Sequence, residues 1–166
     1  MGYPNTEVKL AFASIMLNVY SNSQVNLNSI RLKNAFEERN IEKAMTIIKT
    51  YFSSISYSLT SASKEADYHL MLHCILLAID ADINVEVLTN KGRIDAVLKT
   101  KDTIYVIELK KGKSVEIALE QIKDKGYIEK YKAWESDNIK HEIHLLGINF
   151  SSEDKNISEW KEEVFN

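Results

Sequence analysis

The sequence predicts an α/β fold in which a helical N-terminal segment precedes a core ordered helix, three strands, helix and strand around a mixed sheet. Apolar residues recur at three- and four-residue intervals through the first third of the chain, which is the period of an amphipathic helix. Between residues 84 and 109 the apolar runs are short and separated by turn residues, as is typical of strands. A second helical pattern then leads to another apolar run, and a helix usually connects parallel strands.

The region from Asn5 to about Tyr57 is expected to be helical and to pack on the sheet or on a further domain upstream. A short helix is expected over residues 30–36, with Asn28 or Ser29 as its N-cap. The apolar positions of the two longer helices are Val8, Phe12, Ile15, Met16, Val19, Ile41, Ala44, Met45, Ile48 and Phe52. We therefore expect residues 1–60 to form a helical segment on a core of residues 61–166, within one compact domain.

The core is expected to begin with a helix from Lys64 to about Ala81, capped by Ser61 or Ser63. This helix is apolar around most of its circumference, so we predict that it is buried. A strand over residues 84–88 follows. A turn at residues 90–92 then reverses the chain, because Asn and Gly tolerate positive φ.

The next reversal is expected at Lys101–Asp102, and after a third strand a helix is expected from Val115 to about Trp134. The stripe of this helix that faces the sheet contains Val115, Ala118, Leu119 and Ile122. Residues 142–150 are predicted to form another strand. Residues 160–165 are predicted to form a terminal strand or a short helix.

Charged residues interrupt the second and third apolar runs, at Asp95, Glu108 and Lys110. Because side chains alternate faces along a strand, Glu108 and Lys110 share one face. The third run is apolar on both faces, which predicts a strand in the middle of the sheet. Carboxylates are ligands that Mg²⁺ prefers, and a neighbouring ammonium can orient water or neutralise a phosphate. A Glu-X-Lys triplet alone is often an ordinary strand end, so the prediction depends on its pairing with Asp95.

Other polar residues allow two interpretations each. Gln121 borders the apolar stripe of its helix, and it is equally expected to look toward the site or to border the core. His69 and His73 have the i, i+4 spacing of zinc-binding helices, but the glutamate of a His-Glu-X-X-His motif is absent. We expect core or boundary histidines, or for His69 a place in the cleft one turn from Glu65. The sequence has no phosphate-binding loop of the Gly-x-x-x-x-Gly-Lys-Ser/Thr type.

Composition sets limits on the class of protein. A chain of 166 residues with 45% hydrophobic and 27% charged residues is an ordinary globular domain. Its single cysteine, Cys74, lies among apolar residues and predicts a buried thiol. We expect a cytoplasmic protein, because no secretory signal or apolar run long enough to cross a bilayer is present. The net charge of −3 argues against tight nonspecific nucleic-acid binding, but lysines outnumber acids between residues 109 and 132. That excess indicates either a phosphate-binding patch or a solvated, salt-bridged helix.

The segments Gly92–Asp95 and Ile107–Lys110 resemble the PD-(D/E)XK nuclease superfamily, in which an acid on one strand and an acid-X-lysine on the next form a metal site. Further segments resemble the C-terminal nuclease-like domain found behind an AAA-ATPase-like domain in bacterial and archaeal proteins. These segments are Gly2–Asn5, Tyr68–His69, Ala118–Ile122 with Tyr127, and Gly147–Phe150.

The resemblance implies a restriction-endonuclease-like core with a site formed by Asp95, Glu108 and Lys110, in which the two acids hold Mg²⁺ or Mn²⁺. It also suggests Glu65 as an additional acid, or Asp67 if the register is shifted, and Gln121 as an accessory residue. The candidates for phosphate or cleft contacts are His69, Arg93, Lys111 and Tyr127.

The function that follows is expected to be metal-dependent hydrolysis of nucleic acid, with DNA as the expected substrate. The expected partners are an upstream AAA-ATPase-like domain and, for cutting both strands, a second copy of the chain in a homodimer. The alternative is a catalytically silent module of the same fold that serves a fused or partner ATPase as a binding or regulatory platform.

Overall fold

The computed structural model describes residues 25–54, 65–79, 82–89, 92–126, 128–132 and 141–165. The chain divides into two compact units, residues 1–81 and 82–166. The division predicted at residue 60, within one compact domain, stays a prediction. The helix expected from Asn5 and the caps Ser61 and Ser63 lie outside the described residues.

The first unit contains α2 (Val25–Glu37), α3 (Ile41–Ser54) and α4 (Glu65–Leu77). Asn40 caps α3, since its Oδ1 accepts the backbone N–H of Lys43 at 3.0 Å. The apolar side chains that helical spacing predicted for the core of α3 are buried, namely Ile41, Ala44, Met45, Ile48 and Phe52.

The cap predicted for α2 is wrong, because this helix begins at Val25 and includes both Asn28 and Ser29. The Ser29 hydroxyl is buried and lies 3.2 Å from the Tyr51 hydroxyl of α3. This serine therefore lies within α2 and contacts α3, because a buried hydroxyl group needs a hydrogen-bond partner.

Helix α4 carries a buried apolar surface, as predicted. The Tyr68 ring stacks on Phe52 with 6.3 Å between centroids. Cys74 is a buried free thiol, and burial raises its pKa to about 11, so it is protonated near neutral pH. The helix ends at Leu77, four residues before the predicted end at Ala81.

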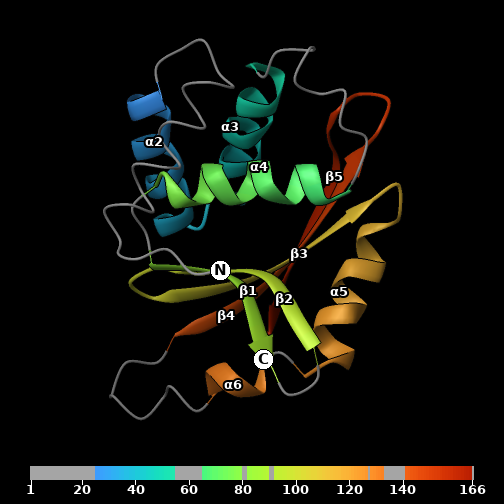
Figure 1. The fold of residues 1–166 in the computed structure, drawn as a ribbon. Helices are drawn as coiled ribbons and strands as arrows, with labels where there is room; N and C mark the ends of the chain where they lie inside the picture. The colour runs from blue at the N-terminus through green and yellow to red at the C-terminus, as the bar shows by residue number, and fades with distance from the viewer. Residues whose placement is uncertain are drawn as a thin grey trace. The chain divides into compact units, whose positions relative to one another are not determined.

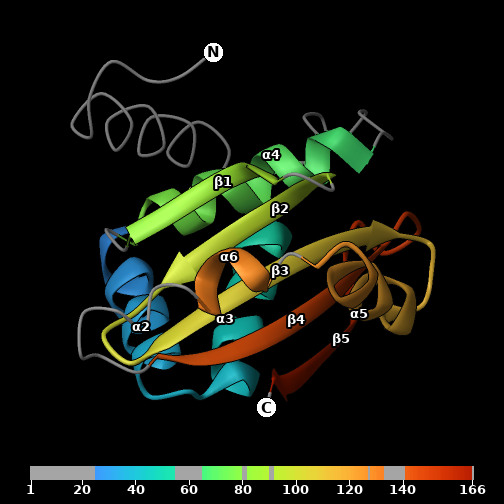
Figure 2. The same ribbon diagram turned by 90° about the horizontal axis from the view of Figure 1, so that it is seen from below.

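The second unit is built on a five-stranded sheet in the order β1-β2-β3-β4-β5, which Figures 1 and 2 show with the strands side by side. Only the β3–β4 pair is parallel, and the three other pairs are antiparallel, so the sheet is mixed as predicted. The strands are β1 (Asp82–Thr89), β2 (Gly92–Lys99), β3 (Thr103–Lys111), β4 (Glu142–Ser151) and β5 (Asn156–Phe165).

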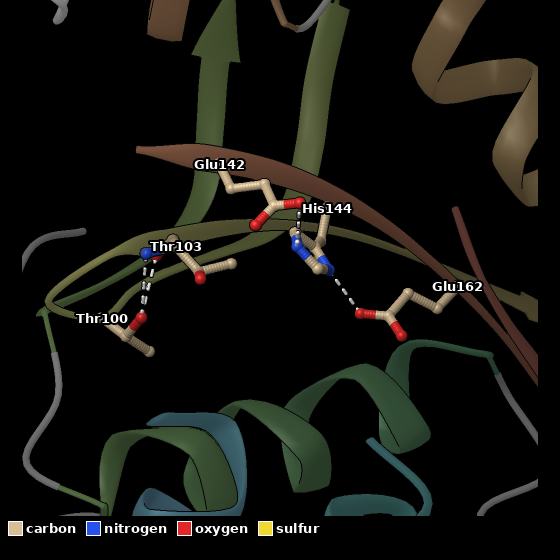
Figure 3. Close-up of polar contacts among 5 residues, drawn as sticks. All are labelled: Thr100, Thr103, Glu142, His144 and Glu162. Atoms are coloured by element: carbon tan, nitrogen blue, oxygen red, sulfur yellow. Dashed lines mark hydrogen bonds and ion pairs between the residues drawn. The ribbon is translucent and has the colours of Figure 1, made fainter. Parts of the chain in front are cut away.

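The reversal between β2 and β3 occurs at residues 101–102, as predicted, and is closed by two threonines. The backbone N–H of Thr100 donates to the Thr103 carbonyl at 2.8 Å. The Thr100 hydroxyl accepts the Thr103 N–H at 3.2 Å (Figure 3). This short turn fixes the register of the hairpin, and therefore which residues of β2 and β3 meet at its other end.

Two helices, α5 (Val115–Asp124) and α6 (Glu129–Lys132), connect β3 to β4 and lie over one face of the sheet (Figure 2). The single helix predicted to reach Trp134 is wrong. Gly126 adopts a φ of 57°, and its N–H bonds back to the Lys123 carbonyl at 3.1 Å. A glycine in this left-handed conformation is a common way to end a helix, so α5 stops one turn after Gln121.

Helix α5 approaches the sheet closely at Gly147 of β4. A Cβ added to this glycine would lie 2.8 Å from the Val115 carbonyl oxygen and 3.2 Å from Ala118 Cβ. The missing side chain therefore lets α5 rest directly on the strand. The core between helices and sheet contains Ile94, Val97, Ile104, Val106, Leu119, Ile122, Ile128, Tyr131, Ile143 and Leu145.

The final strand is longer than expected. β5 begins at Asn156 and includes the predicted segment 160–165, which resolves the choice between strand and short helix in favour of a strand. The order of elements from α4 onward is helix, three strands, helices, two strands. The α/β class with a restriction-endonuclease-like order is thus confirmed, with one additional edge strand and a short α6.

Candidate metal centre

The candidate site begins where the β2–β3 ladder ends. Ala96 pairs with Ile107, and beyond this pair the two backbones no longer bond to each other. The next available donor, the backbone N–H of Leu109, bonds instead to Asp95 Oδ2 at 2.9 Å. The Asp95 carboxylate therefore takes the place of the missing backbone acceptor and is fixed beside Glu108.

Glu108 lies on the central strand β3 and is 1% exposed. One of its oxygens, Oε1, accepts hydrogen bonds from two side chains. Lys110 Nζ donates to it at 2.9 Å, and Gln121 Nε2 of α5 also donates to it. Lys110 shares the face of Glu108, as alternation along the strand predicted, and its side chain is 11% exposed.

The other oxygen of this carboxylate, Glu108 Oε2, is buried and has no hydrogen-bond partner in the described part of the chain. Burying a carboxylate oxygen without a partner is unfavourable. Because Oε1 is already held by two donors, the carboxyl group cannot turn to satisfy Oε2 without losing one of them. The site thus presents a fixed acceptor oxygen next to Asp95.

The electrostatics of the two carboxylates are coupled. Burial, and second the charge of Asp95, raise the pKa of Glu108 from 4.5 to about 7, against the opposing effects of Lys110 and Lys125. Two carboxylates in one buried site repel each other when both are ionised, and an added cation reduces that repulsion. The arrangement is therefore suited to a positively charged ligand.

Gln121 reaches Glu108 because of the close packing at Gly147. Glu108 and Gly147 are partners across the parallel β3–β4 pair. Helix α5 rests on Gly147 through Val115 and Ala118, which brings the next turn of the helix over Glu108. Of the two positions that the sequence allowed for Gln121, the structure shows the one facing the site.

The loop after β3 is also fixed. The backbone N–H of Lys113 donates to Asn149 Oδ1 at 3.0 Å, and Asn149 Nδ2 donates to the Ser158 hydroxyl at 2.9 Å. Gly112 has a φ of 63°, and its N–H bonds to the Phe150 carbonyl at 3.0 Å. This loop leads directly from Lys110 into α5, so its anchoring keeps both elements of the site in place.

The remaining candidates lie in different places. Arg93 is exposed at the start of β2. Lys111 is half-buried at the end of β3, where alternation directs it to the face opposite Lys110. Tyr127 and the side chain of Glu65 lie outside the described residues. His69 is half-buried on α4 in the first unit, 6.3 Å from His73 between ring centroids. The roles of all five stay predictions.

Sequence reasoning did not identify Lys125 or Gly147 as parts of this site. Lys125 was counted only in the local excess of lysines, and Gly147 only as part of a family-like segment. The end of α5 could have been predicted from Gly126, because helices commonly end at a glycine that follows a charged turn.

Metal-binding clusters of three or more His, Cys, Asp or Glu side chains are absent from the residues that the structure describes. An ion at this site would therefore depend on Asp95 and Glu108 with water or backbone oxygens. That is a normal donor set for Mg²⁺, which keeps several waters and binds one or two carboxylates.

A second polar cluster, in which His144 is buried and Glu142 and Glu162 are partly exposed, lies on the opposite face of the sheet. His144 of β4 pairs with Tyr105, and its ring lies 5.3 Å from the tyrosine ring between centroids. Its Nδ1 is 2.5 Å from Glu162 Oε1, and its Nε2 is 3.7 Å from Glu142 Oε1 (Figure 3). Here each carboxylate faces the histidine.

Comparison with known proteins gives a family and a relative. The model of the PD-(D/E)XK nuclease superfamily matches residues 63–160, which is more than half of the chain and includes every residue of the site. A protein of Azotobacter chroococcum, described as an uncharacterized protein in the vnfD 5′ region, is 29% identical over 93% of this chain. The chain spans 31% of the length of that relative. No helix in the described segments is long and apolar enough to cross a membrane. The match over residues 63–160 shows that the chain belongs to the PD-(D/E)XK nuclease superfamily.

Proposed function

We propose that this chain is a metal-dependent nuclease domain that hydrolyses phosphodiester bonds of DNA. The observation that carries the proposal is the buried pair Asp95 and Glu108, in which the described residues hold Glu108 through Oε1 and leave Oε2 without a partner. A hard divalent cation fits this arrangement, because it supplies a partner for Oε2 and positive charge for two adjacent acids. Mg²⁺ is the first candidate and Mn²⁺ the second.

Each residue has a distinct task in this proposal. Asp95 and Glu108 would hold the ion, which when bound compensates phosphate charge and makes a water more acidic. Lys110, 2.9 Å from Glu108, supplies an ammonium that orients the attacking water or donates to a phosphoryl oxygen. Gln121 keeps the Glu108 carboxylate from turning. Leu109 does the same for Asp95 through its backbone N–H.

The test uses the full chain with duplex DNA, single-stranded DNA and RNA in Mg²⁺ or Mn²⁺. We expect cleavage of DNA, and a loss of about 100-fold or more in rate for Asp95→Ala and Lys110→Ala. Titration calorimetry with Mn²⁺ should give heat for the native chain and none for Glu108→Ala. The proposal is contradicted if the native chain cuts none of these substrates. It is also contradicted if both variants cut DNA as fast as the native chain.

The competing proposal is a catalytically silent module of the same fold that serves an AAA-type ATPase. This chain matches only 31% of the length of the Azotobacter relative, which favours a domain within a larger protein. An upstream ATPase-like domain and a homodimer remain proposals. Metal binding separates the two functions. A chain that folds but binds neither ion supports the silent module.

A further inference from the structure

The C-terminal end of helix α5 carries a second lysine whose charge acts on the metal centre. Lys125 caps the C-terminus of α5, and its backbone N–H donates to the Gln121 carbonyl at 3.2 Å. Residues four apart lie on the same face of a helix. Because the Gln121 side chain on that face bonds to Glu108, Lys125 lies one helical turn further along the surface that faces the carboxylates.

The charge of Lys125 acts on the site. It is among the cations that oppose the raised pKa of Glu108, together with Lys110. Its side chain is half-buried, whereas that of Lys110 is 11% exposed and bonded to Glu108. The two lysines thus differ in access, and Lys125 is the one with more of its surface open to a large polyanion.

The neighbouring lysine of the same helical turn points elsewhere. Lys123 pairs with Glu163 of β5 and is 46% exposed. An ammonium in the last turn of a helix interacts favourably with the helix dipole. Lys123 already supplies such a charge at this end of α5.

We propose that Lys125 is a substrate-binding residue that contacts a backbone phosphate of the nucleic acid, beside the phosphate held at Asp95 and Glu108. This inference rests on the proposed function, since it assumes that a nucleic-acid strand enters the site. It assigns Lys110 to the reacting phosphate and Lys125 to its neighbour. A strand would then be held at two successive phosphates, which orients the bond to be cut.

The test measures binding separately from cutting. A fluorescent DNA duplex is titrated with the full chain in Ca²⁺, another cation that prefers oxygen ligands, and a denaturing gel verifies that the DNA stays intact. The variants are Lys125→Gln, Lys125→Arg and the control Lys101→Gln. The control removes the same charge at the exposed β2–β3 turn, at the far end of the hairpin from Asp95 and Glu108.

We expect Lys125→Gln to weaken binding roughly threefold to tenfold and to reduce the salt dependence by about one phosphate contact. Lys125→Arg should bind like the native chain, and so should Lys101→Gln. Calorimetry with Mn²⁺ should show that Lys125→Gln keeps the metal site, which rules out a misfolded variant as the cause.

The outcomes separate the two proposals. Equal binding by native chain and Lys125→Gln overturns the inference, and so does an equal loss in Lys125→Gln and Lys101→Gln, which would reflect net charge alone. If Lys125→Gln binds more weakly but the native chain cuts nothing, the inference stands and the proposed catalysis fails. If the native chain binds neither duplex nor single strand, both fail.

Discussion

Two faces of one sheet each carry a polar cluster with one buried residue at its centre, Glu108 or His144, and the clusters differ in how far their carboxylates are buried. On the face of α5, Asp95 and Glu108 lie together, and one oxygen of Glu108 lacks a partner in the described part of the chain. On the other face His144 lies between Glu142 and Glu162, so that one imidazole ring faces two acids (Figure 3). Glu108 is almost fully buried, whereas the side chains of Glu142 and Glu162 are 39% and 24% exposed.

This difference separates a candidate site from a structural cluster. A buried polar side chain is common to both, since Glu108 is 1% exposed and His144 is 5% exposed. Only the first cluster combines two adjacent acids, a raised pKa and a fixed acceptor oxygen. In the second cluster the buried atom without a hydrogen-bond partner among the described residues is a ring nitrogen, His144 Nε2. In the first cluster it is a carboxylate oxygen, which is the kind of atom that a hard cation binds.

The largest expected effect is the difference between removing a carboxylate from the site face and removing one from the opposite face. Glu108→Ala should abolish the heat of Mn²⁺ binding and reduce DNA cleavage by about 100-fold or more, because the ion loses a ligand. Glu162→Ala should leave both unchanged, because it lies in the cluster on the opposite face. Calorimetry and cleavage assays on the two variants make the comparison. Equal loss of metal binding in both would show that the two faces are not independent.

The second effect is a pH dependence that originates at Glu108 on the site face. The pKa of Glu108 is raised from 4.5 to about 7, so between these values the folded chain holds a proton that the unfolded chain has lost. The stability of the metal-free protein should therefore fall as pH rises through this window, by at most about 3 kcal/mol from this group. A bound cation favours the ionised form and opposes the loss.

Thermal unfolding with and without Mg²⁺ at pH 5.5 and pH 8 measures this effect. The ion should raise the melting temperature more at pH 8 than at pH 5.5. Glu108→Ala is the control, because the effect of Mg²⁺ on its melting temperature should be the same at both pH values. An equal increase at both pH values in the native chain would argue against proton release from the site.

The main elements of this site were accessible from the sequence because they depend on local rules. Alternation along a strand places Glu108 and Lys110 on one face, and two short reversals bring Asp95 to the adjacent strand. The structure confirms these placements. The chemical roles of the three residues stay predictions, because position alone does not establish turnover.

The parts that were missed depend on contacts between segments distant in the sequence. The bond from the Leu109 N–H to Asp95 follows from where the ladder stops, which no local pattern specifies. The approach of α5 to Gly147 depends on the packing of a helix on a strand that follows it by more than twenty residues. The pairing of His144 with Glu162 likewise depends on the register of β4 and β5.

The third prediction concerns the packing that holds the site face together. Gly147→Ala should destabilise the fold by about 1–3 kcal/mol, because the new Cβ would meet the Val115 carbonyl at 2.8 Å and α5 must move. The same movement should weaken the bond from Gln121 to Glu108. Urea unfolding of Gly147→Ala, Gln121→Ala and the double variant should therefore show non-additive changes in the free energy of unfolding.

Gly112→Ala is the matched control for this prediction. Its φ of 63° makes alanine unfavourable by about 1 kcal/mol, yet no atom lies within 4 Å of the added Cβ. Its effect should add to that of Gln121→Ala without coupling. Equal coupling of both glycine variants to Gln121→Ala would mean that the loss of stability in Gly147→Ala does not result from movement of α5.

The smallest effect is expected on the histidine face. Glu162→Ala removes the acceptor at Nδ1 of the buried His144, and a lost hydrogen bond of this kind costs about 1–2 kcal/mol. Glu162→Gln keeps an acceptor oxygen at the same position and should recover part of that loss. Urea unfolding measures the free energies, and Mn²⁺ calorimetry should be unchanged in both variants. A change in metal affinity with little change in stability would reverse the assignment of the two faces, because it would give the histidine cluster the property that we attribute to Asp95 and Glu108.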